Sequence, residues 1–577
     1  MINKNFPSFI FCLVLLLTLQ NKVKGQYILK EADQQYALYN YSRAIDLYER
    51  AYQKKVTLHA AERLAECYKY QQNYIQAENW SALAVAMADS KPINILHYAR
   101  ALQSNAKYAE AKLQYNKYSE QDKGVTEKQK NIWLQSCDSA IRWMKEPTTI
   151  TLKNEEALNS SKSDWGATKL AGNMVFASDR DIINKRRGVG NRSFLKFDGS
   201  KMPDKNTYSW TGNPYLSLYM QEGTEGIKLF PLNAGTAYHV GPASFTADGK
   251  LVYFTLTKID KDVIYEKVEG IKNKVATANI EIYSSTKNDG GEWSVPISFK
   301  YNNAKKYSVG DPYISPDGKH LYFVSNMPGG KGGTDLYVSE KNGSEWGQPV
   351  NLKEINTEGD ERSPAFDEAS NFYFSTDGRI GMGGLDVYTA KFADGKIGEP
   401  KNLGYPTNSP QDDFAFNLLT KETGYLSSNR TGGLGLDDIY SFTLPEPKKV
   451  SYTDPVVLNK EIRIENIYYD FDKWNIRPDA AIELNKLVEV LKENPTIWIV
   501  LGSHTDSRGN DAYNQALSQN RANSAVEYII KRGIDKSRIT AKGYGETRLL
   551  NRCGNGVKCT IEEHQLNRRT EFTIVKQ

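Results

Sequence analysis

Two charged residues near the C-terminus have the types and the spacing needed to hold a small zwitterion. Asp506 lies just past a predicted strand, in the loop that leads to a helix, and Arg521 lies midway along that helix. A carboxylate can accept hydrogen bonds from an ammonium group, and a planar guanidinium can hold a carboxylate through two parallel hydrogen bonds. The alternative is that Asp506 and Arg521 simply pair with each other.

The elements that must position these residues follow a linker over residues 445–463 that is rich in Pro, Lys and Val. Hydrophobic patterning predicts strands over residues 463–469, 497–502, 539–545 and 570–576, and helices over residues 478–492 and 512–532. This order predicts a two-layer α/β sandwich with split βαβ connections.

The stretch from Gly502 to Ala522 closely resembles the C-terminal signature of the OmpA family. Its matching phrases are Thr505-Asp506, Gly509, Tyr513-Asn514, Leu517-Ser518 and Arg521-Ala522, and Asn567-Arg568-Arg569 matches the closing motif of the family. The resemblance covers residues 464–577.

This resemblance implies a domain that binds peptidoglycan without a covalent bond. The family's ligand is diaminopimelate, whose free end carries an ammonium and a carboxylate group. By residue-to-residue match, Asp506 and Arg521 are the ligand grips, and Asn514 and Arg568 line the pocket. His504, which precedes the Thr-Asp pair, is expected to be structural.

The N-terminus is typical of a secretory signal peptide over residues 1–25. Lys4 gives a basic start, residues 9–19 are an apolar run, and Val23-Lys24-Gly25 precedes the expected cleavage site. A buried N-terminal helix is the alternative. Lipidation at Cys12 is not expected, because Phe11 stands where a small residue is needed. We therefore expect an exported, periplasmic protein associated with the cell wall and outer membrane.

Four cysteines remain after the signal peptide. Cys553 and Cys559 flank a Gly-rich loop that closes easily, so we expect them to form a disulfide, which export permits. Cys67 and Cys137 lie about two helical repeats apart, so we expect them to be small buried apolar residues.

Residues 26–145 have a helical pattern with an internal repeat. Ala44, Ala77 and Ala111 lie 33 and 34 residues apart, each three residues after a tyrosine. This pattern resembles the tetratricopeptide repeat, in which small residues let two antiparallel helices approach closely. Such stacks usually bind peptides or proteins; a helical spacer without that role is the alternative.

Residues 147–444 change to short Tyr/Phe/Val runs between Gly, Asp and Pro turns. The stretch over residues 309–323 repeats that over residues 240–254. A second phrase ends at Tyr219, Tyr283, Tyr337, Tyr388 and Tyr440, with spacings of 64, 54, 51 and 52 residues. Five units of this length predict a β-propeller that resembles the TolB type, with a strand near residues 148–152 closing the ring. A sixth, degenerate blade is the alternative.

Polar pairs recur in these units and could suggest metal sites: Ser178-Asp179, Ser325-Asn326 and Ser428-Asn429. Because the pairs recur from unit to unit, we interpret them as turn caps. We expect no metal and no cofactor.

The formal net charge of +5 is small for 577 residues, and no basic stripe predicts nucleic-acid binding. Six scattered histidines, without a Gly-x-Ser-x-Gly or His-Glu-x-x-His motif, argue against an enzyme.

The order of the three regions resembles envelope proteins of the Bacteroidota, including PorE-like components of the type IX secretion and gliding apparatus. The sequence therefore predicts a periplasmic scaffold that tethers an outer-membrane assembly to peptidoglycan through a protein partner. The alternatives are a general envelope-integrity tether of the TolB/Pal type and, less favoured, a wall-targeted hydrolase.

Overall fold

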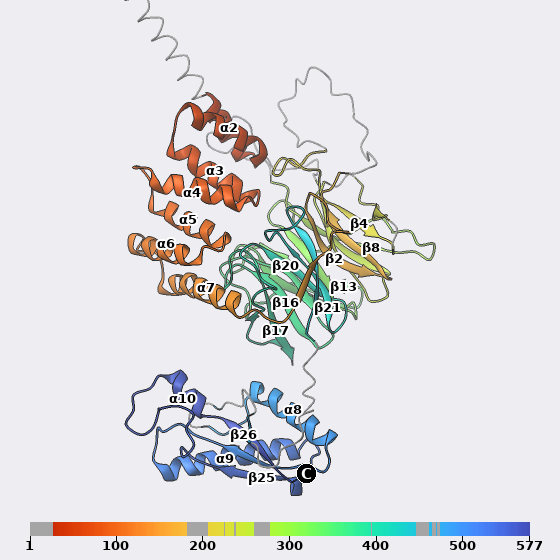
Figure 1. The fold of residues 1–577 in the computed structure, drawn as a ribbon. Coiled ribbons are helices and arrows are strands. Elements are labelled where there is room, and N and C mark those ends of the chain that lie inside the picture. The colour runs from red at the N-terminus through yellow and green to blue at the C-terminus, as the bar shows by residue number, and fades with distance from the viewer. Residues whose placement is uncertain are drawn as a thin grey trace, which may run out of the picture. The chain divides into compact units, whose positions relative to one another are not determined.

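The chain divides into two units, residues 1–446 and residues 447–577 (Figure 1). The computed structural model describes residues 27–181, 206–223, 226–235, 238–258, 277–393, 395–445, 461–463, 469 and 473–576. The predicted signal peptide and most of the predicted linker fall outside these residues. In the part that is described, no helix combines the length and the apolar character needed to cross a membrane.

The first unit begins with a stack of helices in which each one contacts the next along the chain (Figure 1). After a helical segment over residues 27–37, the helices are α2 (Tyr41–Lys54), α3 (Leu58–Tyr70), α4 (Tyr74–Ala86), α5 (Pro92–Ser104), α6 (Tyr108–Gln121) and α7 (Glu127–Lys145). Side-chain caps fix several of their starts. The Thr57 side chain accepts a hydrogen bond from the backbone of Ala60, and Thr126 forms a capping box with Gln129.

The alanines that define the sequence repeat are buried between these helices. Ala44, Ala77 and Ala111 have exposed fractions of only 0%, 3% and 0%. The turns before α2, α4 and α6 each place a residue with positive φ two positions before the helix: Tyr39, Gln72 and Ala106. The predicted helical region is confirmed, and the same turn geometry recurs before α2, α4 and α6.

Cys67 and Cys137 are free and buried, as predicted. Each packs into a hydrophobic core formed mainly by helices. Burial raises the pKa of both thiols to about 12, so both stay protonated at neutral pH. They act as small apolar side chains.

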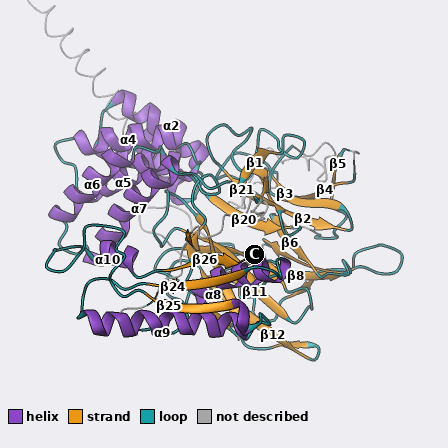
Figure 2. Cartoon of the chain, turned by 60° about the horizontal axis from the view of Figure 1, so that its bottom comes forward, coloured by secondary structure: helices purple, strands orange, loops and turns teal. Residues whose placement is uncertain are grey.

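The rest of the first unit forms five antiparallel sheets in the described part of the chain (Figure 2). The first contains β2 (Asp164–Leu170), β3 (Asn173–Ser178), β4 (Ser217–Gln221) and β5 (Ile227–Leu229). The second contains β6 (Val240–Phe245), β7 (Leu251–Leu256), β8 (Glu281–Thr286) and β9 (Ile297–Ser298). The third contains β10 (Val309–Ile314), β11 (His320–Ser325), β12 (Asp335–Asn342), β13 (Glu345–Trp346) and β14 (Val350–Asn351).

The fourth sheet contains β15 (Glu361–Phe366), β16 (Asn371–Thr376), β17 (Asp386–Ala393), β18 (Lys396–Ile397) and β19 (Lys401–Asn402). The fifth combines β20 (Asp413–Leu418), β21 (Thr423–Ser428) and β22 (Asp438–Thr443) with β1 (Thr151–Asn154). Strand β1 pairs with β22, and Leu152 lies opposite Phe442. The prediction that a strand from the start of the region completes its last sheet is confirmed, with later bounds.

Contacts between the sheets run in a closed cycle. Each sheet contacts the next, and the fifth returns to the first through contacts of β2 with β20 and β21. One strand of each sheet contains a register shift: β2, β6, β10, β15 and β20. A residue with positive φ lies at each shift: Gly166, Gly241, Asp311, Ser363 and Ala415. The same backbone irregularity therefore recurs in all five of these described sheets.

Polar side chains cap the backbone between the strands of four sheets. A side-chain oxygen just after the second strand accepts a hydrogen bond from a backbone N–H before the first strand. The pairs are Asp179 with Ser163, Asn326 with Ser308, Asp377 with Asp360 and Asn429 with Asp412, at 2.7, 2.7, 2.7 and 2.8 Å. The interpretation of the Ser-Asp and Ser-Asn pairs as turn caps is confirmed.

The helices and the sheets of the first unit contact each other through polar side chains. The Tyr74 hydroxyl donates to Asp412 Oδ2 at 3.2 Å, and the Gln72 amide donates to Asp437 Oδ1 at 3.1 Å. Met382, in the loop between β16 and β17 of the fourth sheet, packs into the core of helices α5 to α7. The segments predicted as separate domains, residues 26–145 and 147–444, therefore share one unit.

The second unit contains one four-stranded sheet in the order β23-β26-β24-β25. Its elements are β23 (Glu461–Arg463), α8 (Pro478–Glu493), β24 (Trp498–Ser503), α9 (Asp511–Ile530), a 3₁₀ turn (Lys536–Arg538), β25 (Ile539–Gly543), α10 (Ile561–Asn567) and β26 (Thr570–Lys576). Strands β24 and β25 are parallel, so α9 is their crossover helix. Helices α8 and α9 and the sheet share one apolar core. The predicted α/β sandwich is confirmed, although the sequence did not predict α10.

The contact between the helices and the sheets makes stability sensitive to pH at Asp437. Burial raises the pKa of Asp437 to about 6, and the nearby Asp412 and Asp179 carboxylates add to the effect. Because the folded pKa lies above the ordinary value, ionisation opposes folding as the pH rises through 6. At neutral pH, ionisation of Asp437 lowers the free energy of unfolding by at most about 3 kcal/mol.

We expect Asp437→Asn to raise the melting temperature of the protein at pH 7.5 and to raise it much less at pH 4.5. Circular dichroism melts at the two pH values test this. Asp289→Asn, at an exposed position in a turn after β8, is the matched control. An equal gain at both pH values would contradict the assignment.

Candidate functional site

The loop between β24 and α9 gathers the four residues that the sequence singled out. Strand β24 ends at Ser503, and Asn510 caps α9 by accepting a hydrogen bond from the backbone N–H of Tyr513 at 2.8 Å. The backbone of this loop is tied to both sides. The His504 N–H donates to the Arg569 carbonyl, and the Thr505 N–H donates to the Gly545 carbonyl, both at 2.9 Å. The loop is therefore a rigid support for its side chains.

Asp506 is buried and paired with two arginines. Its carboxylate accepts hydrogen bonds from Arg568 Nη1 at 2.7 Å and from Arg508 Nη2 at 2.8 Å. Burial alone would raise the pKa of Asp506, but the bonds from Arg508 and Arg568 outweigh burial and hold that pKa below its usual value. Asp506 is therefore an anion at neutral pH.

Arg521 is fully buried on α9 beside the same loop. Its Nε donates to the Lys473 carbonyl at 2.9 Å, and its Nη1 donates to the His504 carbonyl at 3.3 Å. The guanidinium lies over the Tyr469 ring, 5.0 Å from the ring centre. The ionic partners of Asp506 are Arg508 and Arg568, so Asp506 and Arg521 do not form the direct pair considered as the alternative.

Asn514 and Arg568 complete the set from two further elements. Asn514 lies one turn into α9, where its amide donates to the Glu546 carboxylate. Arg568 follows α10 and is buried, with Nη1 on Asp506 and Nη2 on the side-chain oxygen of Gln565. Arg568 thus reaches Asp506 from a distant part of the chain, whereas the Asn514 side chain contacts Glu546.

Three buried polar atoms at this loop have no hydrogen-bond partner among the described residues: His504 Nδ1, Thr505 Oγ1 and Arg568 Nε. A buried donor or acceptor without a partner costs free energy. A polar ligand that binds beside Asp506 would satisfy such atoms. The site therefore combines a fixed anion, guanidinium groups and spare hydrogen-bonding capacity, which suits a ligand that carries both charges.

His504 belongs to the support of the loop. Its Nε2 lies 2.8 Å from Glu571 Oε1, and its ring stacks on Tyr544 with 5.1 Å between ring centres. Burial lowers the pKa of His504 despite the neighbouring Glu571. The structural role expected for His504 matches these contacts.

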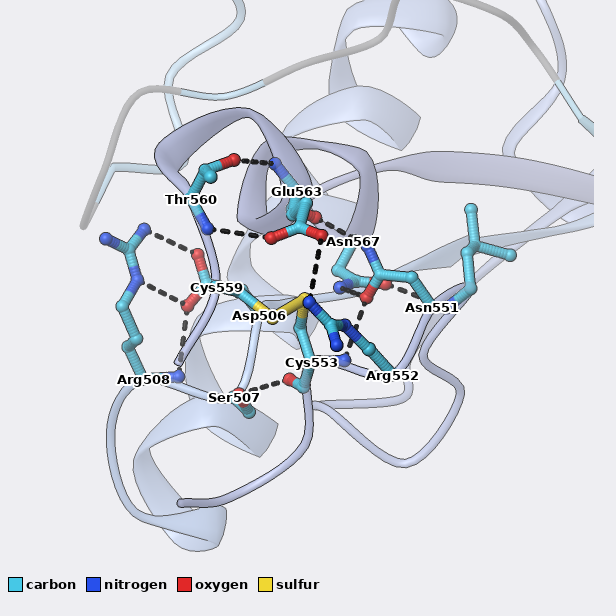
Figure 3. Close-up of a disulfide and its surroundings, with 11 residues drawn as sticks. Asp506, Ser507, Arg508, Asn551, Arg552, Cys553, Cys559, Thr560, Glu563 and Asn567 are labelled. Atoms are coloured by element: carbon cyan, nitrogen blue, oxygen red, sulfur yellow. Dashed lines mark hydrogen bonds and ion pairs between the residues drawn. A yellow bond between two sulfur atoms is a disulfide. The ribbon is translucent and has the colours of Figure 1, made fainter. Parts of the chain in front are cut away.

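A disulfide between Cys553 and Cys559 lies beside the site (Figure 3). The Ser507 hydroxyl donates to the Cys553 carbonyl at 2.5 Å, which joins the disulfide loop to the residue after Asp506. Asn551 ties the same loop to α10, because its amide donates to the Glu563 carbonyl at 2.7 Å. Glu563 and the two sulfurs lie close enough to suggest a metal site. However, both sulfurs are already bonded to each other.

Sequence reasoning missed Arg508, Glu546 and the bond from Ser507 to the disulfide loop. Arg508 could have been found, because a cation two residues after Asp506 in a short loop is within reach of its carboxylate. Glu546 lies in a different loop, and no local signal connects it to Asn514.

The fold and this charged loop define a class: the second unit is an OmpA-like domain. Residues 468–559 match the OmpA family model. Outer membrane protein A of Bordetella avium is 32% identical over 145 residues, which make up 25% of this chain and 70% of that protein. The chain therefore belongs to the OmpA family.

Other relatives share a smaller part of their length. Outer membrane porin F of Pseudomonas fluorescens is 36% identical over 117 residues, which are 20% of this chain and 34% of the porin. A protein of Gloeobacter violaceus named photosystem I P700 chlorophyll a apoprotein A2 is 42% identical over 112 residues, 19% of this chain and 13% of that protein. The chain thus spans 34% and 13% of the length of these two relatives.

Among solved structures, the peptidoglycan-associated lipoprotein from Burkholderia pseudomallei matches with 24% identity and a TM-score of 0.17. The match covers 19% of this chain and 88% of that one.

The disulfide generates a stability prediction. Replacing Cys553 and Cys559 together by serine should destabilise the second unit by about 2–3 kcal/mol, because the open chain regains loop entropy. Urea unfolding of the native and serine forms measures the difference. Mass mapping of the non-reduced protein should find the two cysteine peptides joined, and free thiols there would contradict the pairing.

Proposed function

We propose that this chain is an exported envelope scaffold that binds peptidoglycan non-covalently through its OmpA domain. The observation that carries the proposal is the buried Asp506 carboxylate, held by Arg568 in a family-matched loop beside Arg521. The helical and β-rich parts of the first unit would hold an outer-membrane or periplasmic protein partner.

The proposed ligand is the free end of diaminopimelate in the peptide stem. Asp506 would accept hydrogen bonds from the ligand ammonium, which would take the place of the Arg508 guanidinium. Arg508 can leave, because 38% of its side chain is exposed and it can rotate into solvent. Arg521 would face the ligand carboxylate. Thr505 Oγ1 and Arg568 Nε, two buried atoms that have no partner among the described residues, would complete the hydrogen bonds. Asn514 and its partner Glu546 would line the entrance.

The finer identities of the first unit belong to the same proposal. Helices α2 to α7 are proposed to be tetratricopeptide repeats, supported by the recurring turn before α2, α4 and α6. The five sheets are proposed to be a TolB-like β-propeller. The closed cycle of contacts and the five equal register shifts support five blades rather than six. The proposed domain limits are residues 26–145, 147–444 and 464–577.

The assembly tethered by this scaffold is proposed to be an outer-membrane complex of the type IX secretion kind. A general envelope tether of the TolB/Pal type is the second candidate, because it has the same combination of a propeller and a wall-binding domain. Crosslinking in cells separates the two, since secretion proteins or Tol components would be recovered. We propose no catalytic role, which a peptidoglycan digestion assay tests directly.

Removing either central charge should abolish binding to the wall. Asp506→Ala and Arg521→Ala each leave one charge of the bound zwitterion without a partner, which costs about 2–5 kcal/mol, or roughly 30-fold to a few thousandfold in affinity. Arg521→Lys should be nearly as damaging, because a point charge cannot form the bidentate contact. Sedimentation with diaminopimelate-type sacculi measures the loss.

Arg532→Ala is the matched control, because this exposed arginine follows the end of the same helix. It should sediment like the native protein. Near-native binding by either alanine variant, with an unchanged circular dichroism spectrum, would refute the proposed grip. Free diaminopimelate should compete, whereas lysine, which lacks the second carboxylate, should compete poorly.

A fragment of residues 26–444 should stay folded but should no longer bind peptidoglycan. The division of the chain at residues 446 and 447 places the charged loop entirely in the second unit. The measurement is sedimentation of the purified fragment with sacculi beside the full chain. If the fragment still sediments, wall binding does not belong to the OmpA domain.

A further inference from the structure

A large groove opens on the first unit, far along the chain from Asp506. It has a volume of about 1200 Å³ and is lined by the turns after β10, β15 and β20, together with residues of β12, β14 and β18. It thus crosses the third, fourth and fifth sheets. Its volume exceeds the roughly 300–1,000 Å³ of small-ligand pockets, which favours a segment of polypeptide as the occupant.

Aromatic side chains line part of this groove. Phe366 makes ring contacts with Tyr322 at 4.8 Å, with Tyr313 at 5.8 Å and with Phe392 at 5.7 Å between ring centres. Tyr313, Phe366 and Phe392 are only partly buried. Their exposed faces can pack against apolar side chains or cations.

Another part of the lining is aliphatic. Val350 on β14 lies opposite Val338 on β12, and both valines line the groove. The Val350 side chain is large and apolar, yet 59% of its surface is exposed. A ligand that covers Val350 and the aromatic cluster would therefore remove apolar surface from water.

The charged side chains that line the groove are mostly acidic. They comprise five carboxylates, those of Asp317, Glu340, Glu354, Asp367 and Glu368, against one lysine, Lys396, and His320. With the histidine neutral, one positive and five negative charges give a formal charge of −4. Glu340, Glu354 and Glu368 are exposed and have no ion-pair partner within the described residues.

Two of the carboxylates already serve the fold. Asp317 Oδ1 accepts from the Ser315 hydroxyl, and Asp367 Oδ1 accepts from the backbone of Asn371. The three glutamates make no such turn contact among the described residues, so they remain available to a cationic partner.

We propose that this groove binds an extended segment of a partner protein in which Lys or Arg residues flank a large apolar side chain. The glutamates would face the cations, and Val350 with the aromatic cluster would cover the apolar side chain. The acidic lining disfavours nucleic acid and acidic segments by like-charge repulsion. The proposal deepens the scaffold role and rests on it only in taking the partner to be a protein.

The test is selection of a random dodecapeptide phage library on the purified full-length protein. The enriched peptides should be basic and should contain Leu, Ile, Phe, Tyr or Trp. A synthetic copy of an enriched peptide is then measured by fluorescence anisotropy against two variants. The first is a triple variant, Glu340→Lys with Glu354→Lys and Glu368→Lys, which reverses the charge of the three glutamates. The second, Val350→Asp, places a charge on the apolar lining of the groove.

Each groove variant should weaken peptide binding by roughly tenfold or more, and added salt should weaken binding to the native protein. The control combines Glu292→Lys, Glu399→Lys and Glu422→Lys, three exposed glutamates outside the groove lining. It should bind the peptide like the native protein.

Acidic or no enriched peptides, or unchanged affinity in both groove variants, would overturn the proposal. So would a concentration-dependent dimer that the groove variants abolish, because a second copy would then fill the groove. Sedimentation with sacculi runs in parallel and should not respond to the groove variants. If the native protein binds the enriched peptide but does not sediment with sacculi, the proposed wall binding is refuted and the groove proposal stands.

Discussion

The second unit depends on keeping the Asp506 carboxylate charged inside protein. A buried anion is unfavourable unless it is paired and hydrogen-bonded, and here Arg568 and Arg508 supply both. Because the folded pKa of Asp506 lies below its ordinary value, this stabilisation is present above the ordinary pKa of about 4 and is lost as the pH falls through the lower folded value. Arg568 directly follows the end of α10, and Asn551 ties α10 to the disulfide loop.

Neighbouring contacts follow from the same constraint. A loop that presents a buried charge must not move, and its backbone is accordingly bonded to Arg569 on one side and to Gly545 on the other. His504 fills the space beneath the loop, bonded to Glu571 and stacked on Tyr544. Thr505 Oγ1 and Arg568 Nε remain without partners among the described residues. His504 Nδ1 also has no partner there, so the loop and its buried arginine keep unused hydrogen-bonding capacity.

The sequence predicted elements whose signals are local. The helices around Ala44, Ala77 and Ala111, the Ser-Asp and Ser-Asn caps, and β24, α9, β25 and β26 were found from periodicity and turn chemistry. Contacts between distant segments were not found. Arg568 was known only through family resemblance, and its bond to Asp506 required the fold. The pairing of Gln72 with Asp437 joins residues 365 positions apart, and no pattern in either segment indicates it.

The carboxylates of the two units lie in opposite environments. At Asp506 the carboxylate is buried and fully paired, so affinity there depends on geometry and would be insensitive to salt. In the groove of the first unit, Glu340, Glu354 and Glu368 are exposed and lack ion-pair partners among the described residues, so attraction there is long-ranged, weak per contact and screened by salt. The proposed scaffold would use both kinds of site, one to hold a repetitive polymer firmly and one to bind a protein partner reversibly. Buried pairing suits the first task, and an open acidic surface over apolar side chains suits the second.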